Sequence, residues 1–532
     1  MKLFFTLFLL TFLFAQGADA QPPNYSTSIT GGPSSGYYLL SPFSYTVSGK
    51  YQLIIDGSGS LVYWKRIASF LAWDYKIQPN GQVSYFYQGG STTGFILLDG
   101  SFRPIDTIKA FGFANDPHEL QILPNGHYLL LASENSTQDL SSYNYFHGKP
   151  GSHTATVKSC VIQELDKNKN VVFEWHAKDH FAFNSVDSFW TNNSSSSSVD
   201  WNHANALELD HDGNILLSCR YFNEITKINR STGDIMWRFG GKNNEFTFTT
   251  DSLPFYGQHD IQRQSNGNVT LFDDGNHFTP HGARALEYEL DEVNKTAKLV
   301  WSYQYDPSMY STAMGNAQRL ASANTLVSYG STLTNSICFN VVDTLGTELF
   351  KLAFDGNFYS YRCFYYPSLP WTLPRAQLEC FDSLGTKYLR TRESYASYEW
   401  SDGSIQSSIA VTIPGTYYVY TPFGDGGHLR SMELVVKDLK TFCKTSPAAV
   451  AGLEKPEENR LFPNPADNEL NFVFAQVDDH TKPVIRDIRG REYEVPGKLS
   501  TDQTAYIFDV SSLKPGLYLV VTPNTVDKFT KQ

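Results

Sequence analysis

Three histidines, one asparagine and one arginine stand at related positions of a repeated segment. His118 and His259 each begin a copy, and His203 lies two residues before Asn205, which begins another. Side chains on a strand alternate between two faces, so His203 and Asn205 share a face if the strand extends that far. Arg220 follows the end of that copy. Neutral imidazole is a nucleophile and proton carrier, and guanidinium binds tetrahedral oxyanions through paired donors. The set therefore predicts a site that handles an anionic group.

The repeat predicts the elements that position these residues. Five segments align without gaps, and successive starts are 45, 87, 54 and 56 residues apart. Each alternates apolar residues on both sides of a tight turn, which in the first four copies contains Asn-Gly or Asp-Gly. This pattern is typical of a β-hairpin. The hairpins are predicted at 73–86, 118–131, 205–218, 259–272 and 315–328.

These spacings favour a β-propeller with four strands in each blade. Outer strands after three of the hairpins end at Trp175, Trp237 and Trp301, and residues 51–64 resemble such an outer pair. Counting that pair with strands near 350–366, we predict six blades. A solenoid and a β-sandwich are the alternatives, but closure of a ring leaves fewer sheet edges exposed. In a ring, His118, His203 and His259 would come from three blades and converge on one axial pocket.

Composition and the N-terminus point to an exported protein. The 532 residues carry a net charge of −12, and this acidic balance argues against a nucleic-acid partner. Lys2, the apolar run 3–14 and the small-residue site at 18–20 predict a signal peptide over 1–20. An uncleaved anchor is the alternative, although the run is short for a bilayer. No membrane span is expected in the mature chain.

The C-terminal third predicts two further β domains. Residues 367–440 contain YEWSDG and PGTYYVY, and they resemble a small immunoglobulin-like sandwich. A linker follows at 441–460. In 461–532, the motifs LFPNPADNELNF, IRDIRGREY and DVSSLKPGLYLVV resemble the sorting domain of type IX secretion cargo. That resemblance implies the type IX machinery as a partner and a secreted or surface location. Another small sandwich without a sorting role is the alternative.

Six cysteines include no C-x-x-C pair, so a structural zinc site is not expected. Export permits disulfides. Domain membership makes Cys338 with Cys363, and Cys380 with Cys443, plausible pairs, although the sequence cannot fix them.

Residues 51–366 resemble the PAPS-independent aryl-sulfate sulfotransferases. The resemblance rests on the order of HELQILPNG, DWNHANALELDHDGNILLSCR, TGDIMWRFGG, GQHDIQRQSNGNVTLFDDG and ARALEYEL. It implies a six-bladed propeller that moves a sulfuryl group from a phenolic sulfate ester to a phenol, with no metal or nucleotide cofactor. Carried over by motif, His259 is the nucleophile, and the sulfuryl group is bound by His118, His203, Asn205 and Arg220. The family's phenol-binding tyrosines find no match.

Two other functions fit the same residues. A propeller can also be a non-catalytic binding or adhesion module, and the appended domains suit that equally well. A metallohydrolase would use His118, His203 and His259 as zinc ligands. Arg220 in the same pocket would repel a cation, which argues against the metal.

Overall fold

The structure is a computed structural model that forms two compact units, Met1–Leu439 and Lys440–Gln532. The predicted signal peptide (1–20) and residues 444–459 of the predicted linker lie outside the described residues. Described helices are short: α1 (Ala177–His180), α2 (Ser188–Thr191) and the 3-10 turns η1 (Gly90–Thr92), η2 (Phe183–Ser185) and η3 (Arg220–Phe222). The described residues are 21–31, 35–46, 49–144, 147–191, 195–275, 282–309, 311–332, 337–443, 460–462, 466–473, 483–487, 491–500, 505–522 and 526–531.

All five predicted hairpins are confirmed as antiparallel strand pairs. In the first four copies the turn glycine has a positive φ, from 81° at Gly126 and Gly213 to 89° at Gly267. The fifth copy places Ala323 in the same region, at φ 64°. Only glycine adopts this conformation without a steric cost, so the fifth turn keeps the geometry at some strain.

Two further strands extend each hairpin into an antiparallel sheet, and one more sheet joins the two ends of the repeat region. That joining sheet has the order β27–β2–β3–β4 (Tyr359–Tyr366, Tyr37–Phe43, Lys50–Asp56, Leu61–Ile67). The others are β5–β8 (Leu71–Ile77, Val83–Gln88, Gly94–Leu98, Pro104–Ile108), β9–β12 (Ala114–Ile122, Tyr128–Gln138, Ala155–Leu165, Val171–His176), β14–β17 (Ala204–Leu209, Ile215–Cys219, Glu224–Ile228, Ile235–Gly240), β19–β22 (His259–Arg263, Val269–Asp273, Arg284–Asp291, Thr296–Gln304) and β23–β26 (Asn316–Arg319, Thr325–Ser328, Ile337–Val342, Glu348–Phe354). Edge strands β1 (Tyr25–Ile29), β13 (Ser198–Asp200) and β18 (Thr247–Phe248) add to three of them.

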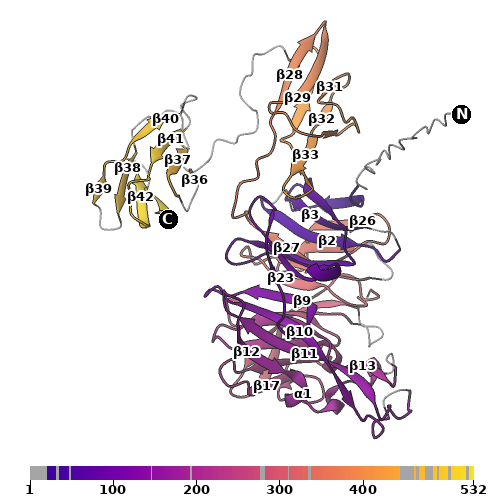
Figure 1. Ribbon diagram of the computed structural model, residues 1–532. Helices are drawn as coiled ribbons and strands as arrows, with labels where there is room; N and C mark the ends of the chain where they lie inside the picture. The colour runs from indigo at the N-terminus through magenta and orange to yellow at the C-terminus, as the bar shows by residue number, and fades with distance from the viewer. Residues whose placement is uncertain are drawn as a thin grey trace, which may run out of the picture. The chain divides into compact units, whose positions relative to one another are not determined.

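The first strands of these sheets contact one another in a closed cycle, in the order β5, β9, β14, β19, β23, β27 and back to β5. Hydrogen bonds between β27 and β2 join the end of the repeat region to its start. Apolar side chains between neighbouring sheets form the core, as Trp175 and Leu217 do in one cluster. The sheets pack side by side in one body (Figure 1). This is the arrangement expected of a propeller.

Bulges interrupt the pairing where the predicted site residues lie. The register of β9 with β10 shifts between Leu130 and Ala132, opposite the segment that carries His118, and that of β19 with β20 shifts between His259 and Gln262. Another shift accompanies Asn205 in β14. Bulges bend a strand and re-aim its side chains, and they are common beside active sites.

The long spacing between the second and third hairpins holds long strands and additional short elements. Strands β10 and β11 are unusually long, and β13 runs parallel to β11. Helix α2, within this region, carries the buried Trp190. The region thus brings a segment with aromatic side chains close to the site.

Residues 367–439 belong to the same compact unit as the repeat region. Strands β34 (Gly427–Arg430), β33 (Val419–Phe423) and β30 (Glu399–Trp400) extend the joining sheet, because β34 pairs with β4. Two separate groups complete the segment: β28–β29–β31 (Leu378–Ser383, Thr386–Thr391, Ser408–Ala410) and β32–β35 (Gly415–Tyr417, Leu434–Val436). Its immunoglobulin-like fold stays a prediction.

The second unit is a small all-β domain. It contains two four-stranded sheets, and Leu470, Phe508 and Val520 lie in its buried core. The sheets are β36–β37–β41–β40 (Arg460–Phe462, Glu469–Val473, Ala505–Asp509, Gly497–Leu499) and β39–β38–β42–β43 (Glu492–Tyr493, Val484–Asp487, Gly516–Val521, Val526–Lys531).

The cysteines correct one expectation. Cys380 and Cys443 are each recorded in a disulfide, whereas Cys338 and Cys363, which were expected to pair, are free, buried thiols. Both lie in one apolar cluster, in β25 and β27, where they pack as small hydrophobic side chains. The Cys338–Cys363 pairing is therefore wrong in this structure.

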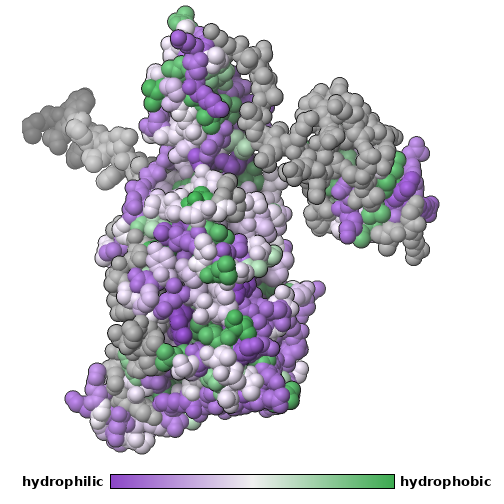
Figure 2. Space-filling view, turned by 180° about the vertical axis from the view of Figure 1, so that it is seen from behind, coloured by the Kyte–Doolittle hydropathy of each residue, from purple (hydrophilic) through white to green (hydrophobic). Residues whose placement is uncertain are grey.

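On the coloured part of the face seen in Figure 2, hydrophilic and weakly polar residues predominate, and apolar residues gather only in small groups. Single exposed apolar side chains, such as Phe70 and Phe111, are normal on a folded protein.

Candidate functional site

His118 lies in β9 and is almost fully buried. Its Nδ1 is 2.5 Å from Oδ1 of Asp116, and the same carboxylate accepts a hydrogen bond of 3.1 Å from the His118 backbone N–H. The ring centroid lies 5.8 Å from that of Tyr361 and 6.3 Å from that of Trp73. The aspartate thus fixes both the backbone and the ring of this histidine.

His203 repeats this arrangement from the segment before β14. Its Nδ1 is 2.5 Å from Oδ2 of Asp200, and its ring stacks on Tyr221 with centroids 4.6 Å apart. Its φ of 45° is one of the positive values for a non-glycine residue, which marks local strain. Burial, opposed by Asp200, lowers the pKa of His203, so the neutral imidazole is favoured. The centroids of His118 and His203 are 5.2 Å apart.

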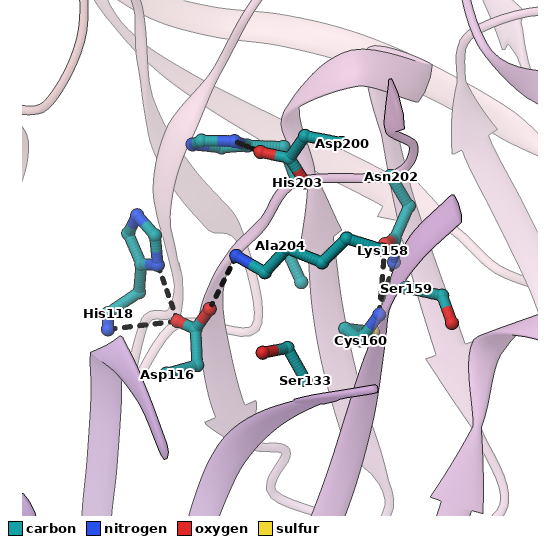
Figure 3. Close-up of a pocket in the computed structure, with 10 residues that line it drawn as sticks. All are labelled: Asp116, His118, Ser133, Lys158, Ser159, Cys160, Asp200, Asn202, His203 and Ala204. Atoms are coloured by element: carbon teal, nitrogen blue, oxygen red, sulfur yellow. Dashed lines mark hydrogen bonds and ion pairs between the residues drawn. The ribbon is translucent and has the colours of Figure 1, made fainter. Parts of the chain in front are cut away.

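A small cavity, open to solvent, lies between these two pairs (Figure 3). Lys158, from β11, extends into it, and its Nζ lies 3.8 Å from Oδ2 of Asp116. Asn202 lies deeper, where its Nδ2 is 3.0 Å from Sγ of Cys160. The lining residues are Asp116, His118, Ser133, Lys158, Ser159, Cys160, Asp200, Asn202, His203 and Ala204.

His259 and Arg220 form a second, more deeply buried group. Nδ1 of His259 is 3.3 Å from Oδ2 of Asp274, and its Nε2 accepts a hydrogen bond of 3.1 Å from the backbone N–H of Met314. Arg220 donates to the backbone oxygen of Thr312 and lies 3.4 Å from the same Asp274 oxygen. Its guanidinium carbon sits 4.3 Å from the ring centroid of Trp190.

Burial acts on both partners of the His259–Asp274 pair. It raises the pKa of Asp274 and, together with Arg220, His203 and His118, lowers the pKa of His259 well below its usual value. Both shifts favour the neutral forms, so Arg220 faces a carboxyl group whose ionisation is disfavoured. This leaves its positive charge poorly compensated and favours an anion beside it.

Several polar atoms of this second group lack a hydrogen-bond partner among the described residues. They are Nε of Arg220, Nδ1 of His259, Oδ1 of Asn205 and Oδ1 of Asp274, all buried. Buried polar groups are nearly always hydrogen-bonded, so such a cluster indicates a site built to bind a polar ligand.

Asn205 is buried and turned toward the next sheet. Its Nδ2 donates a hydrogen bond of 2.7 Å to the backbone oxygen of Gln258, next to His259. Its own backbone oxygen accepts from Tyr361 and Arg362. The amide therefore links β14 to the segment that leads into β19.

The structure brings the predicted residues into two adjoining groups. His118 and His203 border the cavity, whereas His259, Arg220 and Asn205 do not line it. The groups are connected by a hydrogen bond of 3.1 Å, which the Arg220 backbone N–H donates to the backbone oxygen of His203. Charges in both groups also act on the pKa of His259.

Sequence reasoning missed the carboxylates and the lysine. The D-x-H spacing of Asp116 and the D-x-x-H spacing of Asp200 were available as signals, since such short spacings let a carboxylate reach Nδ1. Asp274 and Lys158 come from neighbouring strands and left no local pattern.

A buried charged cluster lies beside the site. Arg362, in β27, contacts Asp74, Glu119 and Asp260, with N–O distances of 3.0, 2.8 and 3.2 Å. The three acidic residues directly follow Trp73, His118 and His259, so each stands one position after the first residue of a hairpin. Removing one partner of a buried ion pair leaves an uncompensated charge, so the cluster holds the inner strands in place.

Within the described ranges, no three His, Cys, Asp or Glu side chains are arranged to hold a metal ion. The Nδ1 atoms of His118 and His203 face aspartates, and Nε2 of His259 faces a backbone amide. No helix in the described part of the chain is both long and apolar enough to span a bilayer.

These features define an all-β, propeller-like protein with a buried, imidazole-rich polar cluster. Residues 34–361 match the arylsulfotransferase (ASST) family, and the chain belongs to that family. Membership supports a sulfotransferase-like enzyme that acts on small molecules. Residues 460–532 match the secretion system C-terminal sorting domain, which indicates export by the type IX system to the cell surface or outside.

The search of curated proteins found no match. Solved structures with a similar chain path include a protein of unknown function from Bacteroides caccae, with 11% identity and a TM-score of 0.39, covering 62% of this chain and 99% of that one. Catalytically inactive virginiamycin B lyase from Staphylococcus aureus with quinupristin shows 9% identity, a TM-score of 0.34 and coverages of 69% and 96%. A putative 6-phosphogluconolactonase from Bacteroides fragilis shows 11% identity and a TM-score of 0.34, and the match covers 63% of this chain and 99% of that one. Likenesses this weak carry no argument about function.

Proposed function

We propose that the protein transfers a sulfuryl group from an aryl sulfate ester to a phenol in two steps, with His259 as the covalent carrier. The observation that carries the proposal is the pairing of an open, imidazole-lined cavity with a buried arginine–histidine group whose polar atoms lack partners. Membership in the family supports the reaction class.

In the first step, the lone pair of an imidazole nitrogen of His259 attacks sulfur, and the sulfur–oxygen ester bond breaks. The departing phenolate takes a proton through Nε2 of His118 or His203, which first accepts that proton from solvent and is left neutral again. In the second step, the acceptor phenol loses its proton to that imidazole, its oxygen attacks sulfur and the nitrogen–sulfur bond breaks. Splitting transfer in this way replaces one difficult displacement by two easier ones.

Arg220 suits the charge that both steps must handle. The sulfuryl oxygens carry negative charge throughout, and a fixed guanidinium stabilises such charge without reorganising. Trp190 covers one face of Arg220, so the guanidinium has little freedom to move. The adjacent Asn205 amide helps to orient the strand that carries His203.

The Met314 contact sets a condition on this mechanism. Nε2 of His259 cannot attack while its lone pair accepts the Met314 N–H. Met314 has a φ of 73°, a strained value for a residue with a side chain, and its neighbour Gly315 has a φ of 103°. A small shift of this turn frees Nε2 toward the sulfuryl group.

Release of nitrophenolate from 4-nitrophenyl sulfate, in the presence of phenol, tests the proposal. The expected products are nitrophenolate and phenyl sulfate, and without phenol the intact protein gains the mass of one sulfuryl group. Peptide mapping then locates that group on His259. The absence of both turnover and adduct over a broad panel of aryl sulfates would leave a non-catalytic binding module as the better account.

A further inference from the structure

Two aspartates hold the cavity histidines in the same way. Asp116 and Asp200 each place a carboxylate oxygen 2.5 Å from Nδ1, although they come from different strands and stand two and three residues before their histidines. A carboxylate accepts the Nδ1 proton, so the lone pair of the neutral ring lies on Nε2. Neither Nε2 is hydrogen-bonded to any residue within the described ranges.

Lys158 lies between the two pairs. Figure 3 shows its side chain extending from β11 past Asp200 toward Asp116. In the parallel pairing of β11 with β13, Lys158 stands opposite Asp200, and its backbone oxygen accepts from Trp201. The ammonium group lies 3.8 Å from Asp116, and the charge of Asp200 also acts on it.

The electrostatic effects agree with this geometry. Burial opposes ionisation of Asp116 and Asp200, but their histidines and Lys158 outweigh it, and the pKa of each carboxyl is lowered. Burial likewise opposes the charge on Lys158, while Asp116 and Asp200 raise its pKa. The three groups thus stay charged together.

We propose that Asp116 and Asp200 are positioning residues that hold His118 and His203 with Nδ1 protonated and Nε2 available for proton exchange with a phenolic oxygen, and that Lys158 couples the two pairs. This inference rests on the proposed function. The two rings border one cavity, with centroids 5.2 Å apart, so a departing and an arriving phenol can use the same pair. Each carboxylate also stabilises the imidazolium that forms while the proton is held.

The test compares two donors whose leaving groups differ in basicity. Phenolate needs a proton as it departs far more than 4-nitrophenolate does. For D116N and D200N, which keep the side-chain size, we expect kcat/KM to fall about 10²-fold or more with phenyl sulfate but less than about tenfold with 4-nitrophenyl sulfate. A merely structural role would lower both values equally, and that result would overturn the inference.

The exposed Asp139–His153 pair supplies a matched control. Its Oδ2–Nδ1 distance is 3.1 Å, and its side chains are 60% and 81% exposed. D139N should therefore leave both donors unaffected. K158M should also lose activity mainly with phenyl sulfate, by a smaller factor than the aspartate variants. K158R, which keeps the positive charge, should retain activity with phenyl sulfate.

A measurement on the wild-type protein tests the inference even if the variants do not fold. Nitrogen-15 NMR of the unliganded wild-type protein should show His118 and His203 protonated at Nδ1, and Nε2–H tautomers would contradict the proposal. Failure of the inference is separable from failure of the proposed function. Wild-type protein that forms the sulfuryl adduct, with variants that lose activity equally on both donors, keeps the enzyme but removes the positioning role.

Discussion

The two groups of the site are built from the same residue types but arranged in opposite ways. Around the cavity, His118 and His203 turn Nδ1 toward close aspartates, and Lys158 keeps those carboxylates charged. In the buried group, His259 sits beside Asp274 at 3.3 Å, and burial disfavours the charge on both. An imidazole that passes protons profits from a charged carboxylate, whereas one that carries a covalent anion profits from remaining neutral. In the proposed mechanism, the first group exchanges protons and the second carries out covalent transfer.

The largest effect is expected when His259, the proposed covalent carrier, is removed. H259A should lower turnover on the order of 10⁴-fold or more, as loss of a covalent nucleophile does in other enzymes. It should also abolish the sulfuryl adduct seen by intact mass. H211A, at the exposed turn of the β14–β15 hairpin, is the control and should keep full activity. An active H259A variant would place the carrier elsewhere, with the open Nε2 atoms of His118 and His203 as the next candidates.

Substitution of Arg220 should have the second largest effect on activity. R220K keeps the charge but loses the planar fork of donors, and we expect kcat to fall about 10²- to 10³-fold because the sulfuryl oxygens lose aligned hydrogen bonds. R319K is a matched control, since Arg319 also covers a tryptophan, with its guanidinium carbon 3.9 Å from the Trp301 ring centroid. Steady-state kinetics with 4-nitrophenyl sulfate measure both variants. Equal behaviour of the two would show that Arg220 has a packing role only.

Trp190 should have a smaller influence, through Arg220. Its ring faces the guanidinium at 4.3 Å, and partly buried cation–π contacts contribute about 1 to 2 kcal/mol, so W190L should lower kcat/KM about 5- to 30-fold. W301L removes the equivalent contact of Arg319 and should leave kcat/KM unchanged. A similar loss in W301L would trace the effect to general destabilisation, which thermal unfolding of both variants would reveal.

The sequence was sufficient for the hairpins because their signal is local. Asn-Gly and Asp-Gly turns and alternating apolar residues specify each strand pair without reference to the rest of the chain, and all five pairs were found. The thiol pair failed for the opposite reason. Cys338 and Cys363 share an apolar cluster, and membership in one domain does not say whether two sulfurs bond.

For the site, the sequence named residues but not their surroundings. The shared register of His118 and His259 was visible, because both begin a hairpin. Strand bulges at His259 and Asn205, the contact of Met314 with His259, and the passage of Lys158 between two aspartates depend on neighbouring strands. No spacing rule encodes such contacts, so the division into an open and a buried group could not be predicted.

The pH dependence offers the finest test of the comparison. Burial lowers the pKa of His259, and Arg220, His203, His118 and Arg362 act in the same direction. The neutral nucleophile therefore persists at pH values where an ordinary histidine, with a pKa of about 6.5, is already protonated. Its activity should be lost only as the pH falls below the lowered pKa.

With 4-nitrophenyl sulfate, whose leaving group needs little protonation, kcat/KM should change less than about twofold between about pH 7.5 and about pH 6, whereas an unshifted histidine would lose about fourfold. Tryptophan fluorescence at each pH shows whether the protein stays folded. A fourfold loss in a folded protein would mean that His259 titrates as an exposed imidazole does. The buried group would then be open to solvent during turnover, and its contrast with the cavity would be lost.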